Sequence, residues 1–205
     1  MHGVLLALQL MTVSQKWESQ GQSQGLQVAT HPVEGSSYDA IRVIGISPAD
    51  PLMQIEEMWG VSTKENQANK SSIGEHKVLA ETATHREYYQ TVVAPLISER
   101  DYVIAFDKKP VGAGYEIRFA TVDDPRYPPT KDKVRMSVVG VASVEPRAEG
   151  GCTLTYELHN DLKGSLPPWV AKGAQRDAAV EWVKVMVTRA EKRLAAEKKA
   201  AQEKK

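Results

Sequence analysis

The chain has few of the residues that form disulfides or bind metal ions. Its 205 residues include one cysteine, Cys152, so no disulfide can form within the chain and no site can draw two thiolates from it. The five histidines show no metal-binding spacing such as H-E-x-x-H. Acidic and basic side chains number 26 each, which leaves no positive excess for nucleic acid. We therefore expect no metal, no cofactor and no nucleic-acid partner.

Long apolar runs are also missing, because no window after the N-terminal segment approaches the ~18 residues of a membrane-spanning helix. Residues 1–16 begin M-H-G-V-L-L-A-L-Q-L-M. They resemble a signal-peptide core but lack a preceding basic residue and a clear cleavage site. An amphipathic helix, a truncated start or a signal remnant all fit. We expect a cytoplasmic protein, with a periplasmic or secreted location as the alternative if residues 1–16 are a signal.

What the chain does contain is a regular series of strand-like segments between two helices. Asp50 can cap a short helix with Pro51 at its first position. Arg147–Gly151 and the Lys108-Lys109-Pro110 stretch are interpreted as hairpin loops, and the proline-rich stretch 123–131 as a candidate gate. The predicted elements are two paired strands within 26–46, a helix over 50–60, strands at 74–82, 86–94, 101–107, 113–122, 133–145 and 152–160, and a helix from Pro167 or Pro168 to about Leu194.

This order predicts an α+β fold in which a long C-terminal helix covers a curved antiparallel sheet. A sheet of this size cannot bury its concave face alone, and a helix lying across it is the natural cover. We assign residues 17–195 to one domain and residues 196–205 to a charged, solvated tail, a membrane-touching tail being the alternative.

Few residues carry catalytic chemistry. Cys152 follows two glycines at a predicted strand start, where an inert thiol is expected because no histidine partner is identified. Asp123 and Asp124 are adjacent in the proline-rich loop, and their side chains diverge, so turn formation is the simpler role. The Gly112-Ala113-Gly114 turn lacks the third glycine of a dinucleotide fingerprint. We predict a binding protein and no catalytic residues.

Two short motifs point to a family. Ser98-Glu99-Arg100-Asp101-Tyr102-Val103 resembles the R-D-[FY]-V signature of the steroidogenic-acute-regulatory-related lipid transfer (START) domains. Residues 161–167, D-L-K-G-S-L-P, resemble the signature that precedes their C-terminal helix. The similarity runs from about Trp17 to Leu194. It implies a helix-grip fold of the Bet v 1-like superfamily, a hydrophobic tunnel for one sterol, phospholipid or related lipid, and transfer of that lipid between membranes.

The resemblance also implies a polar site within the tunnel. In sterol-binding members a glutamate thirteen residues before the motif arginine pairs with an arginine six residues after it. The corresponding residues here are Glu87 and Phe106, so the acid lacks its basic partner, and Arg118 and Arg135 are the candidate replacements. Glu87 lies either in the tunnel or outside it in a salt bridge, because periodicity does not say which face of the strand is inside. Arg100 is interpreted as tying strands together.

The expected ligand contacts combine three elements. Tyr89 shares a strand face with Glu87, and Tyr102, Ile104 and Phe106 share one with Arg100. Trp169, Gly173 and Val180 lie on the apolar side of the long helix. We expect a monomer that binds one lipid and contacts membranes transiently. The alternatives are a polyketide cyclase or aromatase on the same fold, and a lipid-dependent sensor.

Overall fold

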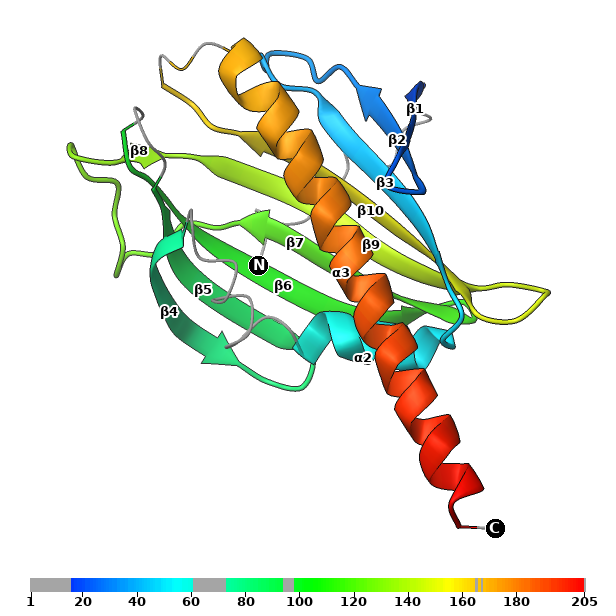
Figure 1. The fold of residues 1–205 in the computed structure, drawn as a ribbon. Coiled ribbons are helices and arrows are strands. Elements are labelled where there is room, and N and C mark those ends of the chain that lie inside the picture. Colours follow the sequence, from blue (N-terminus) through cyan, green and yellow to red (C-terminus); the bar gives the residue numbers. More distant parts are fainter. Residues whose placement is uncertain (1–15, 61–72, 94–97, 165, 167, 205) are drawn as a thin grey trace.

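The protein was examined in a computed structural model, which describes residues 16–60, 73–93, 98–164, 166 and 168–204. Residues 1–15 of the predicted N-terminal segment and the last residue of the strand predicted at 86–94 therefore lie outside the described residues. Figure 1 shows one curved sheet with a long helix lying diagonally across it. The described elements are β1 Glu18–Ser23, β2 Leu26–His31, β3 Ala40–Ser47, α2 Pro51–Gly60, β4 Ile73–Glu81, β5 His85–Val92, β6 Arg100–Val111, β7 Gly114–Thr121, β8 Val134–Arg135, β9 Ser137–Pro146, β10 Cys152–Asp161 and α3 Pro168–Gln202.

The strands are ordered β1-β2-β3-β10-β9-β7-β6-β5-β4, with β8 beside β6. All neighbours on this path are antiparallel, as predicted, whereas the two-residue β8 pairs with β6 in parallel. The sequence prediction missed β1, a polar strand at the sheet edge. The Lys108-Lys109-Pro110 stretch is not a loop, because β6 continues through it to Val111. Gly112, with φ of 56°, makes the turn instead.

The short helix α2 begins as its sequence predicts. The Asp50 carboxylate accepts a hydrogen bond from the Met53 amide at 2.9 Å, which satisfies one of the free N–H groups of the first turn. Gln54 is fully buried, and its side-chain amide donates to the Met186 carbonyl of α3 at 3.1 Å. This bond fixes α2 against α3 at one end of the sheet.

The long helix α3 packs closely on β3 through Gly45. A Cβ at Gly45 would lie 3.1 Å from the Val183 side chain and 3.4 Å from that of Val187. The helix axis can approach the sheet this closely because the glycine has no side chain. α3 runs to Gln202, beyond the predicted end near Leu194, and its last turns project past the sheet (Figure 1). No helix among the described residues has the length and hydropathy required to span a bilayer.

Candidate functional site

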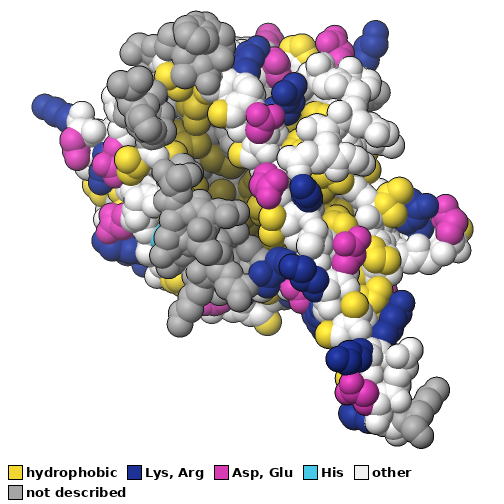
Figure 2. Space-filling view, in the orientation of Figure 1, with side chains coloured by type: hydrophobic (Ala, Val, Ile, Leu, Met, Phe, Trp, Pro, Cys, Tyr) yellow, Lys and Arg dark blue, Asp and Glu magenta, His cyan; other side chains and the backbone are white. Residues whose placement is uncertain are grey.

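A cavity of about 620 Å³ lies between the concave face of the sheet and α3. Figure 2 shows hydrophobic side chains at the bottom of a hollow beside this helix. Four small or apolar positions of α3, Ala171, Ala174, Ala178 and Trp182, recur at helical spacing along the cavity. The wall is completed by residues of α2, of strands β4–β7, β9 and β10, and of the connections between elements. Its apolar members include Met58, Ile73, Val92, Ile117, Met136, Val138, Ala142, Leu158, Leu162 and Leu166.

Aromatic rings cross the cavity wall in an unbroken series. Ring centroids are 4.8 Å apart for His76 and Tyr88, 5.7 Å for Tyr88 and Phe106, and 5.6 Å for Phe106 and Phe119. The series continues through Tyr156, which stacks on Trp182 of α3 at 4.2 Å. Contacts of this kind hold large side chains in fixed positions. The cavity therefore has a rigid, apolar wall from β4 to α3.

A chain of hydrogen bonds joins three polar side chains on this wall. The Tyr102 hydroxyl donates to Gln90 Oε1 at 2.8 Å, and Gln90 Nε2 lies 2.7 Å from His76 Nδ1. The other ring nitrogen of His76 is buried without a partner among the described residues. Burial raises the pKa of Tyr102 to about 12, so the phenol is neutral, and burial lowers the pKa of His76. These groups offer a ligand hydrogen bonds without a charge.

Two arginines complete the polar part of the wall. Arg86 lies near α2, where its guanidinium stacks over the Trp59 ring at 4.3 Å. Arg100 lies at the opposite end, where its Nη2 would be 3.8 Å from a Cβ on Gly164. The two sequence motifs therefore meet in space, since Gly164 belongs to the turn before α3. The described wall residues include no aspartate or glutamate.

The neighbouring residue of the first motif points the other way and organises the outer face. The Asp101 carboxylate accepts two hydrogen bonds from Arg135, both of 2.9 Å, and Arg135 also donates to the Tyr127 carbonyl at 2.8 Å. The Tyr127 ring stacks on Tyr89 at 4.3 Å. These contacts fix the predicted gate loop against the outer side of β5. None of residues 123–131 lines the cavity, and the role of this loop as a gate stays a prediction.

The predicted ligand residues divide according to strand face. Tyr102, Ile104 and Phe106 line the cavity, as expected. Glu87 and Tyr89 do not, because β5 presents Arg86, Tyr88 and Gln90 to the inside and its odd-numbered residues to the outside. Glu87 instead lies 3.3 Å from His85 Nε2 and 4.0 Å from Arg126, which is the salt-bridged alternative left open above.

The two candidate basic partners of Glu87 are also outside the cavity. Arg118 donates to Glu116 at 2.8 Å, two positions away on the outer face of β7, and Arg135 is held by Asp101. The placement of these two arginines beside a ligand is therefore corrected. No cross-cavity pair of Glu87 with either of them forms.

Among the described side chains, the structure places none of the predicted ligand residues of α3 at the main cavity. Val180 is buried in the core and Gly173 borders a different pocket, so neither lines the main cavity. Trp169 belongs to the first turn of α3, but its side chain is outside the described part of the structure. Sequence reasoning missed the alanines and Trp182. Their spacing of three to four residues was the available signal, but alanine carries little hydrophobic weight beside valine.

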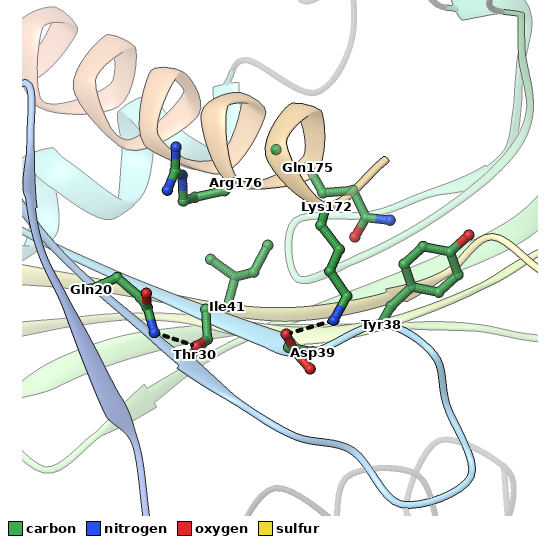
Figure 3. A pocket seen from close by; sticks show the side chains of 9 residues that line it. Gln20, Thr30, Tyr38, Asp39, Ile41, Lys172, Gln175 and Arg176 are labelled. Carbon is green, nitrogen blue, oxygen red and sulfur yellow. Dashed lines mark hydrogen bonds and ion pairs between the residues drawn. The ribbon is translucent and has the colours of Figure 1, made fainter. Parts of the chain in front are cut away.

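The second pocket, of about 240 Å³, lies between the β1–β3 edge and α3. Figure 3 shows Lys172 reaching from α3 to Asp39, at 3.1 Å, and Gln20 bonded to Thr30. Gln175 contributes to this pocket and to the main cavity. The second pocket is small and its charged groups are paired, so we place the binding site in the main cavity.

The environment of Cys152 disfavours a reactive thiol, and the described residues contain no cluster of metal ligands. Burial raises the pKa of the Cys152 thiol to about 11, which opposes formation of the nucleophilic thiolate. Within the described ranges, no three His, Cys, Asp or Glu side chains gather as a metal site would require. The cavity wall can therefore interact with a ligand through hydrogen bonds, through the charges of its arginines and through apolar contacts.

Comparison with known proteins agrees with this architecture. The START domain family matches residues 6–195, so the chain belongs to the START domain family. An uncharacterized protein of Pseudomonas aeruginosa is 26% identical over 185 residues, covering 88% of this chain and 90% of that protein. Human START domain-containing protein 10 is 33% identical over 100 residues, which cover 48% of this chain and 34% of the human protein.

Solved structures show the same helix-grip fold. The STAR-related lipid transfer protein of Xanthomonas axonopodis superposes with a TM-score of 0.69 at 25% identity, covering 85% of this chain and 98% of that chain. The crystal structure of human STARD10 gives a TM-score of 0.71 at 22% identity, covering 97% and 82%. The predicted α+β class, the curved antiparallel sheet and the long C-terminal helix are confirmed.

Proposed function

We propose that the protein binds one lipid molecule in the cavity beneath α3 and transfers it between membranes. The observation that carries this proposal is the cavity itself, which has about 620 Å³ of space and a mostly apolar wall. That volume lies within the range of about 300–1,000 Å³ for pockets that bury small ligands. Burial of acyl or ring surface would supply roughly 25 cal/mol per Å².

Family membership and one relative support the same function. START domains bind lipids, and the structurally similar Xanthomonas axonopodis protein is described as a lipid transfer protein. Transfer needs an opening, and α3 is the element that covers the cavity. We propose that α3 moves relative to the sheet at its first turn, where Gly164 permits the preceding chain reversal.

Lipid binding is tested with delipidated protein and fluorescent analogues of a sterol, a phospholipid and a fatty acid. We expect saturable one-to-one binding of at least one class. Ala178→Trp should reduce it at least about tenfold, because the indole would occupy space now lined by a methyl group. Ala196→Trp, on the exposed end of α3, is the matched control and should bind normally. Absence of saturable binding to every class would refute the proposal.

Transfer is tested separately, with donor vesicles that carry the bound lipid and acceptor vesicles that carry a quencher. We expect the protein to accelerate lipid movement and Ala178→Trp to abolish the acceleration. Mass spectrometry of the recovered lipid should show an unchanged molecule. A changed mass would instead indicate catalysis on this fold.

A further inference from the structure

The two arginines of the cavity differ in how their charge is compensated. Arg86 Nη2 lies 3.0 Å from the Glu81 carboxylate, and its Nη1 donates to the Trp59 carbonyl. Arg100 is 3% exposed, and it has no carboxylate within ion-pair distance among the described residues. Its Nη1 donates to the Ser98 carbonyl, whereas its Nε is buried with no acceptor in that part of the chain. Among the described residues of the cavity wall, Arg100 is therefore a cation without a counter-charge.

The acidic residues nearest to Arg100 are committed to other cations. Glu99 lies 3.8 Å from Lys133 Nζ, and Asp101 binds Arg135 on the opposite face of β6. Asp161, the last residue of β10, pairs with Lys163 Nζ at 2.5 Å. A buried guanidinium without a counter-charge is costly. Among the described residues, none supplies the anion that this site favours.

Other unpartnered polar atoms face the same cavity. Asn160 Oδ1 and Gln175 Nε2 are both buried without hydrogen-bond partners among the described residues, and both side chains line the wall. Gln175 also borders the second pocket together with Tyr38 (Figure 3). The charge of Arg100 acts on Tyr38, because it opposes the rise in the Tyr38 pKa that burial and Asp161 cause. Gln175 thus borders both the second pocket and the main cavity, whereas Tyr38 lines the second pocket.

We propose that the lipid carries an anionic head group, a carboxylate or a phosphate monoester, which pairs with Arg100 while its apolar tail extends along the aromatic wall toward α2. This inference rests on the proposed function and specifies its ligand. A guanidinium binds either anion with two parallel hydrogen bonds. Gln175 Nε2 supplies a further donor, and Asn160 Oδ1 can accept from a protonated or hydroxyl oxygen of the head group.

The experiment compares lipids that share a tail and differ in head-group charge. Delipidated full-length protein is titrated at mildly alkaline pH with hexadecanoic acid against hexadecanol, and with a lysophosphatidic acid against the monoacylglycerol of the same chain. Competition with a fluorescent lipid measures each affinity. We expect the anionic member of at least one pair to bind about tenfold to a hundredfold more tightly. The pair with the larger ratio identifies carboxylate or phosphate.

Arg100→Gln should remove that preference while leaving hexadecanol binding within about twofold, and Arg100→Lys should retain part of it. Arg118→Gln, which changes an arginine on the outer face, is the matched control and should keep the preference. Circular dichroism checks that each variant folds. If Arg100→Gln does not fold, the comparison of charged and neutral lipids with the unaltered protein still decides the question.

Equal affinity for the charged and neutral members of both pairs would overturn this inference and leave the proposed lipid binding standing. An anion preference that survives Arg100→Gln in a folded variant would also overturn it. Failure of every lipid to bind would refute the proposed function itself. The three failures are therefore distinguishable.

Discussion

The two faces of the sheet at strands β4–β6 satisfy their polar groups in opposite ways. On the outer face, Asp101 binds Arg135 through two contacts of 2.9 Å, and Tyr89 stacks on Tyr127 of the adjoining loop. On the inner face, Arg100 Nε and His76 Nε2 are buried without partners among the described residues. Buried polar groups are normally paired. The difference teaches that the protein pairs these groups on the outer face, whereas on the inner face it leaves polar atoms unpaired among the described residues, as the proposed lipid binding would require.

The largest effect on stability should come from the outer face. Asp101→Asn leaves the Arg135 guanidinium without its counter-charge beside a side chain that is 1% exposed. We expect a loss of about 2–3 kcal/mol in the free energy of unfolding, below the usual cost of breaking a buried pair because Arg135 is itself 21% exposed. Urea denaturation monitored by circular dichroism measures it.

Glu116→Gln is the matched control, since it breaks the more exposed pair with Arg118 and should cost less than about 1 kcal/mol. Equal losses in the two variants would mean that Asp101 has no special structural role. Asp101→Asn should leave lipid affinity unchanged in the folded protein, whereas Arg100→Gln should alter affinity. These opposite effects of substitutions at two neighbouring residues test most directly whether the outer face serves stability and the inner face serves lipid binding.

A smaller effect is expected at the turn before α3. Gly164 has φ of 71°, in the left-handed region, so Gly164→Val should cost about 1–2 kcal/mol from backbone strain. The valine would also approach Val134 and Arg100 at the end of the cavity. We expect a lower melting temperature and altered rates of lipid exchange, measured by stopped-flow fluorescence.

Gly173→Ala provides the control for that substitution. Gly173 lies inside α3 with no atom within 4 Å of a new Cβ, so alanine should raise stability by up to about 1 kcal/mol and leave lipid exchange unchanged. Unchanged stability and exchange in Gly164→Val would show that the turn does not need its glycine. This result would remove the turn from the proposed opening of α3.

Most of the fold could be predicted from the sequence because its local signals agree. Asp50 and Pro51 start α2 as their types require, and the glycines before Cys152 separate β9 from β10. The end of β6 could not be predicted in this way. Lys108, Lys109 and Pro110 favour a turn locally, but pairing with Ile117, Glu116 and Tyr115 across the sheet continues the strand.

The site was harder to predict because it depends on which face of each strand is inside. Alternation along β6 groups Tyr102, Ile104 and Phe106 on one face, and these three residues line the cavity. The face of β5 follows only from the pairing of Gln90 with Tyr102 and of Tyr88 with Ile104. A one-residue shift exchanges the two faces, so the register of β5 decides which of its side chains face the cavity. This is why Glu87 was expected as a ligand contact and Gln90 was not.

The smallest effects should appear in the pH dependence, where an inner and an outer histidine differ in sign. Bonding to Asp107, opposed in part by burial, raises the pKa of His85 above its ordinary 6.5. The contribution of His85 to the free energy of unfolding is therefore fully present below pH 6.5. It is lost as the pH rises through the pKa of His85 in the folded state. Burial lowers the pKa of His76, so its contribution is present above pH 6.5 and is lost as the pH falls toward the lower folded-state value.

Single substitutions separate these two contributions from the other titrating groups. The destabilisation caused by His85→Gln should be larger below pH 6.5 than above it, and that caused by His76→Gln should be smaller below pH 6.5 than above it. Urea titrations of both variants and the unaltered protein on each side of pH 6.5 give the four differences. The same sign of pH dependence for the two histidines would contradict the contrast between an ion-paired outer face and a desolvated inner wall. A bound lipid that contacts His76 Nε2 should change the pH dependence of the stability loss caused by His76→Gln. The corresponding pH dependence for His85→Gln should stay unaltered, because His85 lies on the face away from the cavity.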